Sequence, residues 1–139
     1  MDAPRWGLAM ALLALACAPP EDRPDRQFVQ HGRQYTAWLY GSEYNKLWDR
    51  FSPEMRQTFG SVADLASFAG RALTNLGIER KVVDESVQLA DPLVVYSRNA
   101  SFDKSRQDML IEWSLAKDGA VTGLVVRPAP SAKSVNSEQ

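Results

Sequence analysis

Apolar residues in the first half of the chain recur with the period of an α-helix. Stripes with this spacing cover residues 28–39, 44–51 and 65–76. A repeat of about 3.6 residues places such side chains on one face of a helix. The sequence therefore predicts three helices between Gln27 and Leu76, each with one apolar face.

Residues typical of helix ends separate these segments. Ser42 is available as an N-cap, Ser52 precedes a proline at a first helical position, and Ser61 begins a capping box. A serine hydroxyl at such a position accepts a hydrogen bond from a free backbone N–H of the first turn. Gly60 and Gly77 are predicted to end the helices that precede them, since glycine adopts the backbone conformation that closes a helix.

After Gly77 the apolar period changes to two, which is typical of strands with one buried face. The predicted strands are residues 83–89, 93–102, 109–115 and 120–127. The turns between them are Asp91-Pro92, the polar loop 103–108 and Asp118-Gly119. Four strands joined by such short turns form an antiparallel meander. The predicted fold class is α+β, with N-terminal helices packed on one face of a four-stranded antiparallel sheet.

The turn at Asp118-Gly119 sets the expected register of the last two strands. It pairs three residues of the third strand with three of the fourth: Leu115 with Thr122, Trp113 with Leu124 and Ile111 with Val126. The odd-numbered residues of the third strand then share the face that meets the helices. The predicted core is Trp48, Phe68, Leu73, Ile111, Trp113 and Leu124.

The register of the preceding hairpin decides where Arg98 lies. A symmetric hairpin places Arg98 opposite Trp113 on the apolar face. There the cation would stack on the indole or line a pocket for an anionic ligand, because a buried charge needs a partner. A shift of one residue would instead set Arg98 against Glu112 as a cross-strand ion pair.

The N-terminus reads as a targeting segment. Residues 7–16 form an unbroken apolar run about half as long as a membrane-spanning helix, which needs about 20 residues. The run ends in Leu13-Ala14-Leu15-Ala16-Cys17, which resembles a bacterial lipobox. In a lipobox the Cys becomes the first residue of the mature chain and carries diacylglycerol on its sulfur. We therefore expect Cys17 to be lipidated and the chain to reside in the bacterial cell envelope, anchored to a membrane and facing the periplasm or the exterior.

The chain accordingly divides into four parts. A lipoprotein signal peptide covers residues 1–16, and a disordered tether with three prolines and five charges covers 17–26. A segment of this composition has too little apolar surface to bury a core. The folded domain covers 27–127, and a second polar segment, 128–139, forms a disordered tail.

Charge and residue counts exclude several kinds of site. The chain has 16 Lys and Arg against 17 Asp and Glu, without a basic run, whereas nucleic-acid binding needs basic residues gathered on one surface. One Cys and one His cannot form an intrachain disulfide or a zinc site of the Cys/His kind. We expect no nucleic-acid partner, no metal and no cofactor.

The order of elements resembles the nuclear transport factor 2-like cone, which the SnoaL-type cyclases and ketosteroid isomerases share. A narrower resemblance is to a bacterial envelope domain of unknown function often found ahead of a β-lactamase-type serine hydrolase. It is carried by residues 38–44, Leu47-Trp48, Phe51-Ser52, Leu65, Phe68, Gly77, Ile111-Glu112-Trp113 and Asp118-Gly119. These are structural positions, so the resemblance implies a shape and not an activity.

Four residues are candidates for a ligand site on this fold: Arg98, Tyr96, Trp113 and His31. A catalytic site of the isomerase type would need a carboxylate in an apolar pocket opposite a hydroxyl donor. Tyr96 is the candidate donor, and the spacing leaves Asp49, Asp84 and Glu112 open as the acid. No catalytic residue is predicted. Ser101-Phe102-Asp103-Lys104 has the spelling of a penicillin-binding nucleophile motif but lacks the partner motifs that the chemistry needs.

The function expected from the sequence is a noncatalytic, lipid-anchored envelope protein with a module that binds a small ligand or another envelope protein. One alternative is an accessory module that binds an envelope ligand or peptidoglycan fragment for a separate hydrolase. The other is an enzyme of the isomerase or cyclase type. The expected partners are the membrane, through the lipid on Cys17, and a small ligand or envelope protein, with homodimerisation through the sheet left open.

Replacing Cys17 by Ser should abolish lipid labelling in the native host and move the protein from the membrane fraction to the soluble fraction. The thiol is the atom that receives the lipid in a lipobox, and a serine hydroxyl does not replace it. Metabolic labelling with a radioactive fatty acid followed by fractionation measures both effects. A Cys17→Ser protein that stays with the membranes would contradict the lipobox interpretation.

Overall fold

The structure is a computed structural model that describes residues 24–130. Within this range the chain forms the helices α1 (Pro24–Tyr40), α2 (Tyr44–Asp49), α3 (Pro53–Phe59) and α4 (Val62–Leu76). The strands β1 (Glu79–Ala90), β2 (Leu93–Phe102), β3 (Met109–Leu115) and β4 (Val121–Pro128) follow. They form one antiparallel sheet in the order β1-β2-β3-β4. The predicted α+β class, with helices followed by an antiparallel meander, is confirmed.

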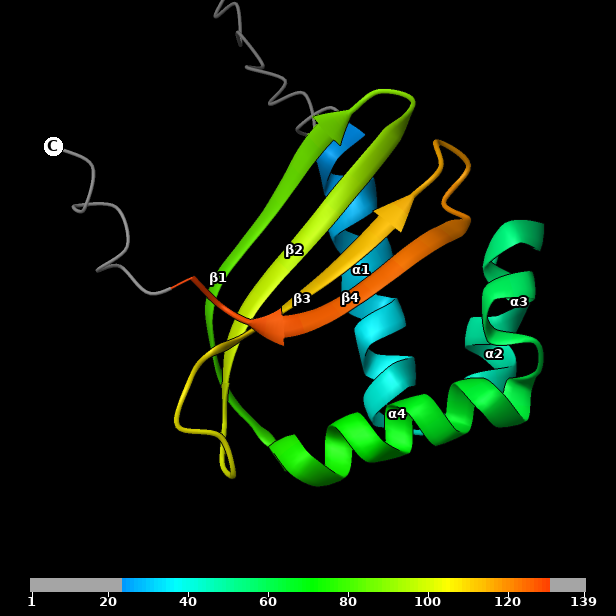
Figure 1. Ribbon diagram of the computed structural model, residues 1–139. Coiled ribbons are helices and arrows are strands. Elements are labelled where there is room, and N and C mark those ends of the chain that lie inside the picture. The colour runs from blue at the N-terminus through cyan, green and yellow to red at the C-terminus, as the bar shows by residue number, and fades with distance from the viewer. Residues whose placement is uncertain (1–23, 131–139) are drawn as a thin grey trace, which may run out of the picture.

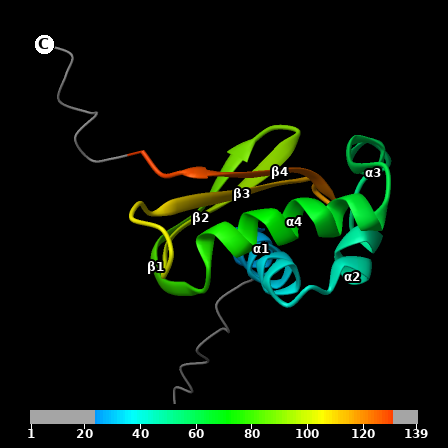
Figure 2. The ribbon, with the colours of Figure 1, turned by 60° about the horizontal axis from the view of Figure 1, so that its bottom comes forward.

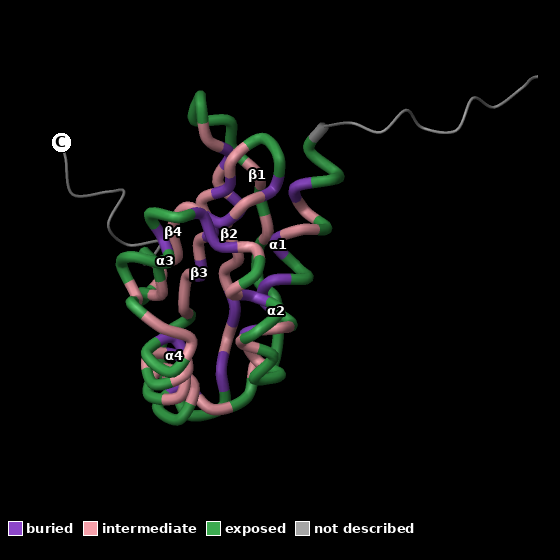
Figure 3. Tube along the Cα trace, turned by 90° about the vertical axis from the view of Figure 1, so that its right-hand side faces the viewer, coloured by how far each residue is buried: buried purple, intermediate pink, exposed green. Residues whose placement is uncertain are grey.

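The helices lie on one side of the sheet. In Figure 1, α1 passes behind the sheet, α4 crosses one end of it, and α2 and α3 lie beyond β4. Figure 2 shows α1, α2 and α4 below the strands and α3 beside the edge of the sheet formed by β4. The buried positions alternate along β2 and β3 and follow the side of α1 that faces the strands (Figure 3). The core therefore lies between α1 and the inner face of the sheet.

Most of the predicted helix ends are confirmed. Ser52 and Ser61 cap α3 and α4 by accepting hydrogen bonds from Met55 N and Asp64 N. Gly60 and Gly77 end these helices with positive φ angles of 84° and 78°.

The prediction that Ser42 caps a helix is wrong. Ser42 has a φ of 59°, and the residue before α2 is Glu43, which makes no side-chain cap. The backbone N–H groups of Ser42 and Glu43 instead donate to carbonyls of the last turn of α1. Ser42 thus belongs to the end of α1. The described part of the chain has four helices, because the short helix that begins after Ser52 and ends at Gly60 is separate from the three apolar stripes.

A close approach between α1 and the sheet lies at the centre of the core. A Cβ atom on Gly32 would overlap the ring of Tyr96 on β2, so only glycine allows the helix backbone to lie this near the strand. One turn further along, Thr36 donates to the Gly32 carbonyl (2.7 Å) and accepts from the indole N–H of Trp113 on β3 (3.0 Å). Both polar groups are buried and paired, which avoids a desolvation penalty.

Two of the six predicted core residues are fully buried. Ile111 and Trp113 are 1% and 0% exposed. The other four predicted core residues are only partly buried: Trp48, Phe68, Leu73 and Leu124. The reason is their position at the rim. Trp48 is covered on one side by the Arg56 guanidinium, and Leu73 faces a pocket.

The register of the last hairpin agrees with two of the three predicted pairs. Trp113 lies opposite Leu124 and Ile111 opposite Val126. Leu115 pairs with Val121 and not with Thr122, because a bulge interrupts the ladder after Ser114.

The preceding hairpin differs from both sequence-based alternatives. Arg98 lies opposite Ile111, and Tyr96 takes the place opposite Trp113. This displacement of two residues keeps Arg98 on the inner face, since side chains alternate with period two. The one-residue shift is wrong, because Glu112 lies opposite Ser97.

The limits of the folded part extend slightly beyond the predicted ones. α1 begins at Pro24, within the predicted tether, and β4 ends at Pro128. The predicted signal peptide 1–16, Cys17 and most of the predicted tail lie outside the described residues. Within 24–130, no helix combines the length and hydropathy that crossing a bilayer requires.

Two glycine substitutions test the contact between α1 and the sheet. Gly32→Ala should lower the free energy of unfolding by about 1 to 3 kcal/mol, because the added methyl group forces the Tyr96 ring aside. Gly70→Ala on α4 is the matched control, since nothing lies within 4 Å of its added Cβ. It should raise the free energy of unfolding by about 0.5 to 1 kcal/mol, as alanine is the better helix former. Chemical denaturation measures both, and equal effects of the two substitutions would contradict the close approach.

Candidate functional site

Arg98 on β2 lies between two carboxylates of β1. Its side chain is only 15% exposed and forms a two-pronged ion pair with Glu79, in which Nε donates to Oε2 over 3.0 Å and Nη2 donates to Oε1. Nη1 lies 3.7 Å from Oε2 of Glu85. A buried unpaired charge would cost several kcal/mol, so these carboxylates are what permits Arg98 to face the core.

Side chains of α1 complete both carboxylate sites. Tyr40 donates to Oε2 of Glu79 (2.7 Å). Glu85 accepts from the Tyr96 hydroxyl and receives a two-pronged ion pair from Arg33, with Nε to Oε2 at 3.0 Å and Nη2 to Oε1 at 2.6 Å. We call the whole set the charge network: Arg33, Tyr40, Glu79, Glu85, Tyr96 and Arg98. With two cations and two carboxylates it is neutral, and it ties the edge strand β1 to α1.

The hydrogen bonds of the charge network fix its protonation state. Burial acts to raise the pKa of Glu79, but the hydrogen bonds from Arg98 and Tyr40 outweigh it and hold the pKa below its usual 4.5. Hydrogen bonds from Arg33 lower the pKa of Glu85 despite partial burial. Burial, assisted by the carboxylate of Glu85, raises the pKa of Tyr96 to about 12. At neutral pH the carboxylates are therefore ionised and Tyr96 is a hydrogen-bond donor.

Glu79 also lines a pocket of about 390 Å³. The pocket lies where the ends of α1, α4 and β2 meet the start of β1, and its lining residues are Tyr40, Leu73, Gly77, Ile78, Glu79 and Phe102. Leu73, Ile78 and Phe102 give apolar walls, and Glu79 is the charged lining residue. Volumes of about 300 to 1,000 Å³ are typical of small-molecule sites. The pocket thus has the size and composition of a site for a small, mostly apolar ligand.

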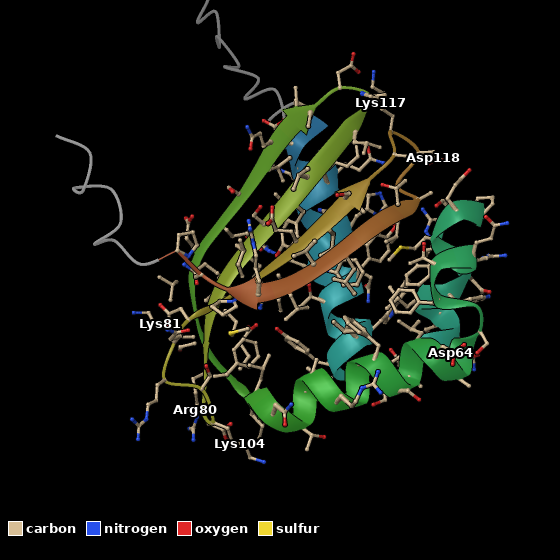
Figure 4. All side chains as sticks on the ribbon, viewed as in Figure 1. Asp64, Arg80, Lys81, Lys104, Lys117 and Asp118 are labelled. Atoms are coloured by element: carbon tan, nitrogen blue, oxygen red, sulfur yellow. The ribbon has the colours of Figure 1, made fainter. Side chains whose placement is uncertain are left out.

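The wall between α4 and β1 is fastened to the loop after β2. Gly77 has a φ of 78°, and a Cβ there would overlap the Asp103 carboxylate. The same carboxylate accepts from Ile78 N (2.8 Å). Glycine is therefore required at this turn, which holds Ile78 at the pocket. Figure 4 shows Arg80, Lys81 and Lys104 at this corner of the domain, beyond the end of α4.

The structure brings together two of the four predicted site residues. Arg98 and Tyr96 are both in the charge network, with Nη1 of Arg98 3.4 Å from the Tyr96 hydroxyl. Trp113 is fully buried under α1. His31 lies towards the other end of α1, next to Gly119. The binding role of these residues stays a prediction.

The three candidate acids are not at the pocket. Asp49 and Asp84 are exposed, and Glu112 lies opposite Ser97 and pairs with Arg127 (3.0 Å). Glu79 takes the position that the isomerase alternative requires of a carboxylate, with Tyr40 as its hydroxyl donor.

Glu79 and Glu85 are not among the predicted acids, although the sequence contains one signal for them. Glu79 and Glu85 are an even number of residues apart on one strand, so they share a face. The expected alternation began instead at Val83, which a bulge between Val82 and Asp84 leaves half exposed. Leu89, at the other end of that alternation, is 69% exposed. Tyr40 and Arg33, which complete the network, are seven residues apart on one side of α1.

Comparisons with known proteins give no relative to set beside this site: no family model, curated protein or solved structure matches the chain. The resemblance to the nuclear transport factor 2-like cone therefore stays a prediction.

Acidification should remove the stabilising effect of the charge network. The pKa values of Glu79 and Glu85 are lower in the folded state than in the unfolded state, where the value is 4.5. The two carboxylates therefore contribute fully to the free energy of unfolding above pH 4.5, and this contribution is lost as the pH falls through their folded-state pKa values. Arg98→Met should lower the free energy of unfolding by about 3 kcal/mol at pH 7, because it leaves a partly buried carboxylate unpaired. The difference from the unsubstituted protein should shrink well below pH 4.

The matched control is Arg127→Met, which breaks the exposed ion pair with Glu112 on the other face of the sheet. It should cost less than about 1 kcal/mol at either pH. Denaturant titrations at pH 7 and pH 3 measure the four values. A loss for Arg98→Met that is the same at both pH values would contradict the assigned ion pairs.

Proposed function

We propose that this chain is a noncatalytic binding protein of the bacterial cell envelope. Lipid on Cys17 holds it to a membrane, and its α+β domain receives a small, mostly apolar ligand in the pocket at Glu79. The observation that carries the binding function is the pocket itself, in which apolar walls surround one ionised, oriented carboxylate.

The carboxylate defines the ligand class. Arg98 and Tyr40 hold Glu79 by three hydrogen bonds, so its position is fixed before a ligand arrives. A carboxylate oxygen accepts more than one hydrogen bond, and Oε1 receives only the bond from Arg98 among the described contacts. The ligand that fits has an apolar body, which contacts Leu73, Ile78 and Phe102, and one N–H or O–H donor directed at Glu79.

The same geometry favours binding over proton transfer. A general base works best when its pKa lies near the working pH, whereas the pKa of Glu79 is held below 4.5. Tyr40, the hydroxyl nearest to this carboxylate, donates to it and not into the pocket. The acid and the donor that an isomerase needs are thus bonded to each other.

The envelope location rests on the lipobox at Cys17 and on the short distance to the domain. Seven residue-to-residue steps, through residues 18–23, lead from Cys17 to the start of α1 at Pro24. Fully extended, they span about 25 Å at most. A lipid on Cys17 would therefore hold the end of the domain where α1 begins close to the membrane, with the pocket at the opposite end of α1. A cone-like bend of the sheet, as in the nuclear transport factor 2-like proteins, is part of the same proposal.

Ligand binding can be tested with N-phenyl-1-naphthylamine, an apolar fluorescent probe with a single N–H donor. We expect a saturable rise in its fluorescence with the unsubstituted protein. Leu73→Trp fills the pocket from a half-buried position and should weaken the apparent affinity at least tenfold. Glu79→Gln removes the charged acceptor and should weaken it about threefold to tenfold.

Thr74→Trp is the matched control, since Thr74 is exposed on the same helix and does not line the pocket. It adds the same side chain one residue away and should leave the affinity unchanged. Probe binding that is equal in Leu73→Trp and Thr74→Trp, or no saturable binding to the unsubstituted protein, would contradict the proposed function.

A further inference from the structure

A second group of polar side chains lies towards the end of the domain where α1 begins. It consists of His31 and Tyr35 on α1, Arg50 directly after α2, and Gly119 in the turn between β3 and β4. His31 and Tyr40 are nine residues apart on α1, which is about 14 Å along a helix. The group is therefore separate from the pocket at Glu79.

Arg50 is held in place without being neutralised. Its Nε donates to the Tyr35 hydroxyl (3.1 Å) and its Nη2 to the Asp118 carbonyl (3.4 Å). Tyr35 in turn donates to the carbonyl of Gly119. In the described part of the chain, no carboxylate oxygen lies within 4.0 Å of the Arg50 guanidinium. This distinguishes it from Arg98, which has two carboxylates.

His31 faces the same point as Arg50. Its ring stacks on that of Tyr35, with centroids 5.7 Å apart and planes 16° from parallel. A Cβ on Gly119 would lie 3.0 Å from both Nε2 of His31 and Nη2 of Arg50. The two nitrogen groups thus converge over a residue without a side chain. Among residues 24–130, the imidazole ring of His31 makes no hydrogen bond.

The other charged groups nearby already have partners. Asp118 accepts from Ala120 N through Oδ1 (2.9 Å), and Lys117 pairs with Asp91 of the β1–β2 turn (3.2 Å). Figure 4 shows Lys117 and Asp118 in the β3–β4 turn, at the upper end of the sheet. Burial, and then the charge of Arg50, lower the pKa of His31. Asp118 keeps its charge but forms no ion pair with Arg50, so the guanidinium has no carboxylate in direct contact and an imidazole lies beside it.

We propose that His31 and Arg50 form a binding site for a phosphate-type oxyanion. Nε and Nη2 of Arg50 have partners, but Nη1 makes no hydrogen bond among the described contacts and offers its N–H donors to the oxygens of a phosphate group. The imidazole supplies another N–H to a third oxygen. Because Gly119 has no side chain to cover them, Nε2 of His31 and Nη2 of Arg50 are not screened from an approaching anion by this residue.

The proposed envelope function would give this site a position next to a membrane. That position rests on the proposed lipid anchor at Cys17. If Cys17 holds the start of α1 near a membrane, the oxyanion site lies at the membrane-facing end of the domain. A lipid headgroup and free phosphate then present the same chemistry to His31 and Arg50. The site itself requires neither the lipid anchor nor the pocket at Glu79.

The histidine provides a direct measurement, because His31 is the only imidazole in the chain. Its ring C–H signals can be followed by NMR through a pH titration of the full chain, in chloride and in inorganic phosphate at matched ionic strength. A bound anion favours the imidazolium, so phosphate should raise the titration midpoint of His31 by about half a pH unit or more. The shift should saturate with phosphate concentration.

Arg50→Gln should abolish this response. Arg56→Gln is the matched control. Arg56, on α3, also donates to backbone carbonyls and forms no ion pair among the described residues. Glu79→Gln should leave the response intact, which separates the oxyanion site from the pocket. An equal phosphate response in Arg50→Gln and Arg56→Gln, or none in the unsubstituted chain, would overturn the proposal.

If Arg50→Gln fails to fold, His31→Asn carries the test, with the backbone amide signal of Gly119 as the readout. The apparent affinity for phosphate should then fall at least fivefold. An unchanged affinity would overturn the role of His31.

Two short-chain lipids separate the sources of the anion. Dihexanoyl phosphatidylglycerol below its micelle concentration presents an anionic headgroup, and dihexanoyl phosphatidylcholine is its zwitterionic counterpart. A His31 response to phosphatidylglycerol but not to phosphatidylcholine supports a lipid headgroup at the site. A response to inorganic phosphate alone supports a free anion, and no response to any of the three overturns the site.

Discussion

The close contact between Gly32 on α1 and the Tyr96 ring on β2 determines how the helix lies on the sheet. Because α1 is fixed there, its two sides reach different strands. Arg33 and Tyr40 on one side meet the carboxylates of β1, while Tyr35 on the other side reaches the turn between β3 and β4. The pocket and the oxyanion site thus both depend on one residue that has no side chain.

Charge is distributed differently at the two ends of α1. At the pocket end, Arg98 and two carboxylates are only partly exposed and compensate each other, so the energetic value of the network lies in positioning Glu79 and holding the edge strand. A well-paired cation of this kind has little capacity left for an external anion. At the other end, Arg50 is oriented by a hydroxyl and a carbonyl, which fix a guanidinium without cancelling its charge. The first arrangement suits a mostly apolar ligand, and the second suits an anion.

The pattern along β2 predicts the face on which Arg98 lies but not the residues with which it pairs. Its place on the inner face follows from alternation along β2, and a register error of two residues did not change that face. Its partner did not follow. Glu79 lies on the far side of two β1 irregularities, which place Glu79 and Glu85 on either side of the Arg98 guanidinium. A bulge depends on how two strands fit together, and a single strand's pattern does not reveal it.

The sequence by itself determined the α+β class, the order of elements, the caps at Ser52 and Ser61, and the burial of Ile111 and Trp113, since each depends on periodicity or on neighbours a few residues apart. A pattern that resembles a lipobox ends at Cys17, outside the described residues, and stays a prediction. The tertiary structure alone decided which groups become partners: Glu79 with Arg98 and Tyr40, and His31 with Arg50. The members of these pairs are 19 to 39 positions apart in the sequence. Their approach depends on helix placement and strand register, which are properties of the packed chain and not of any segment.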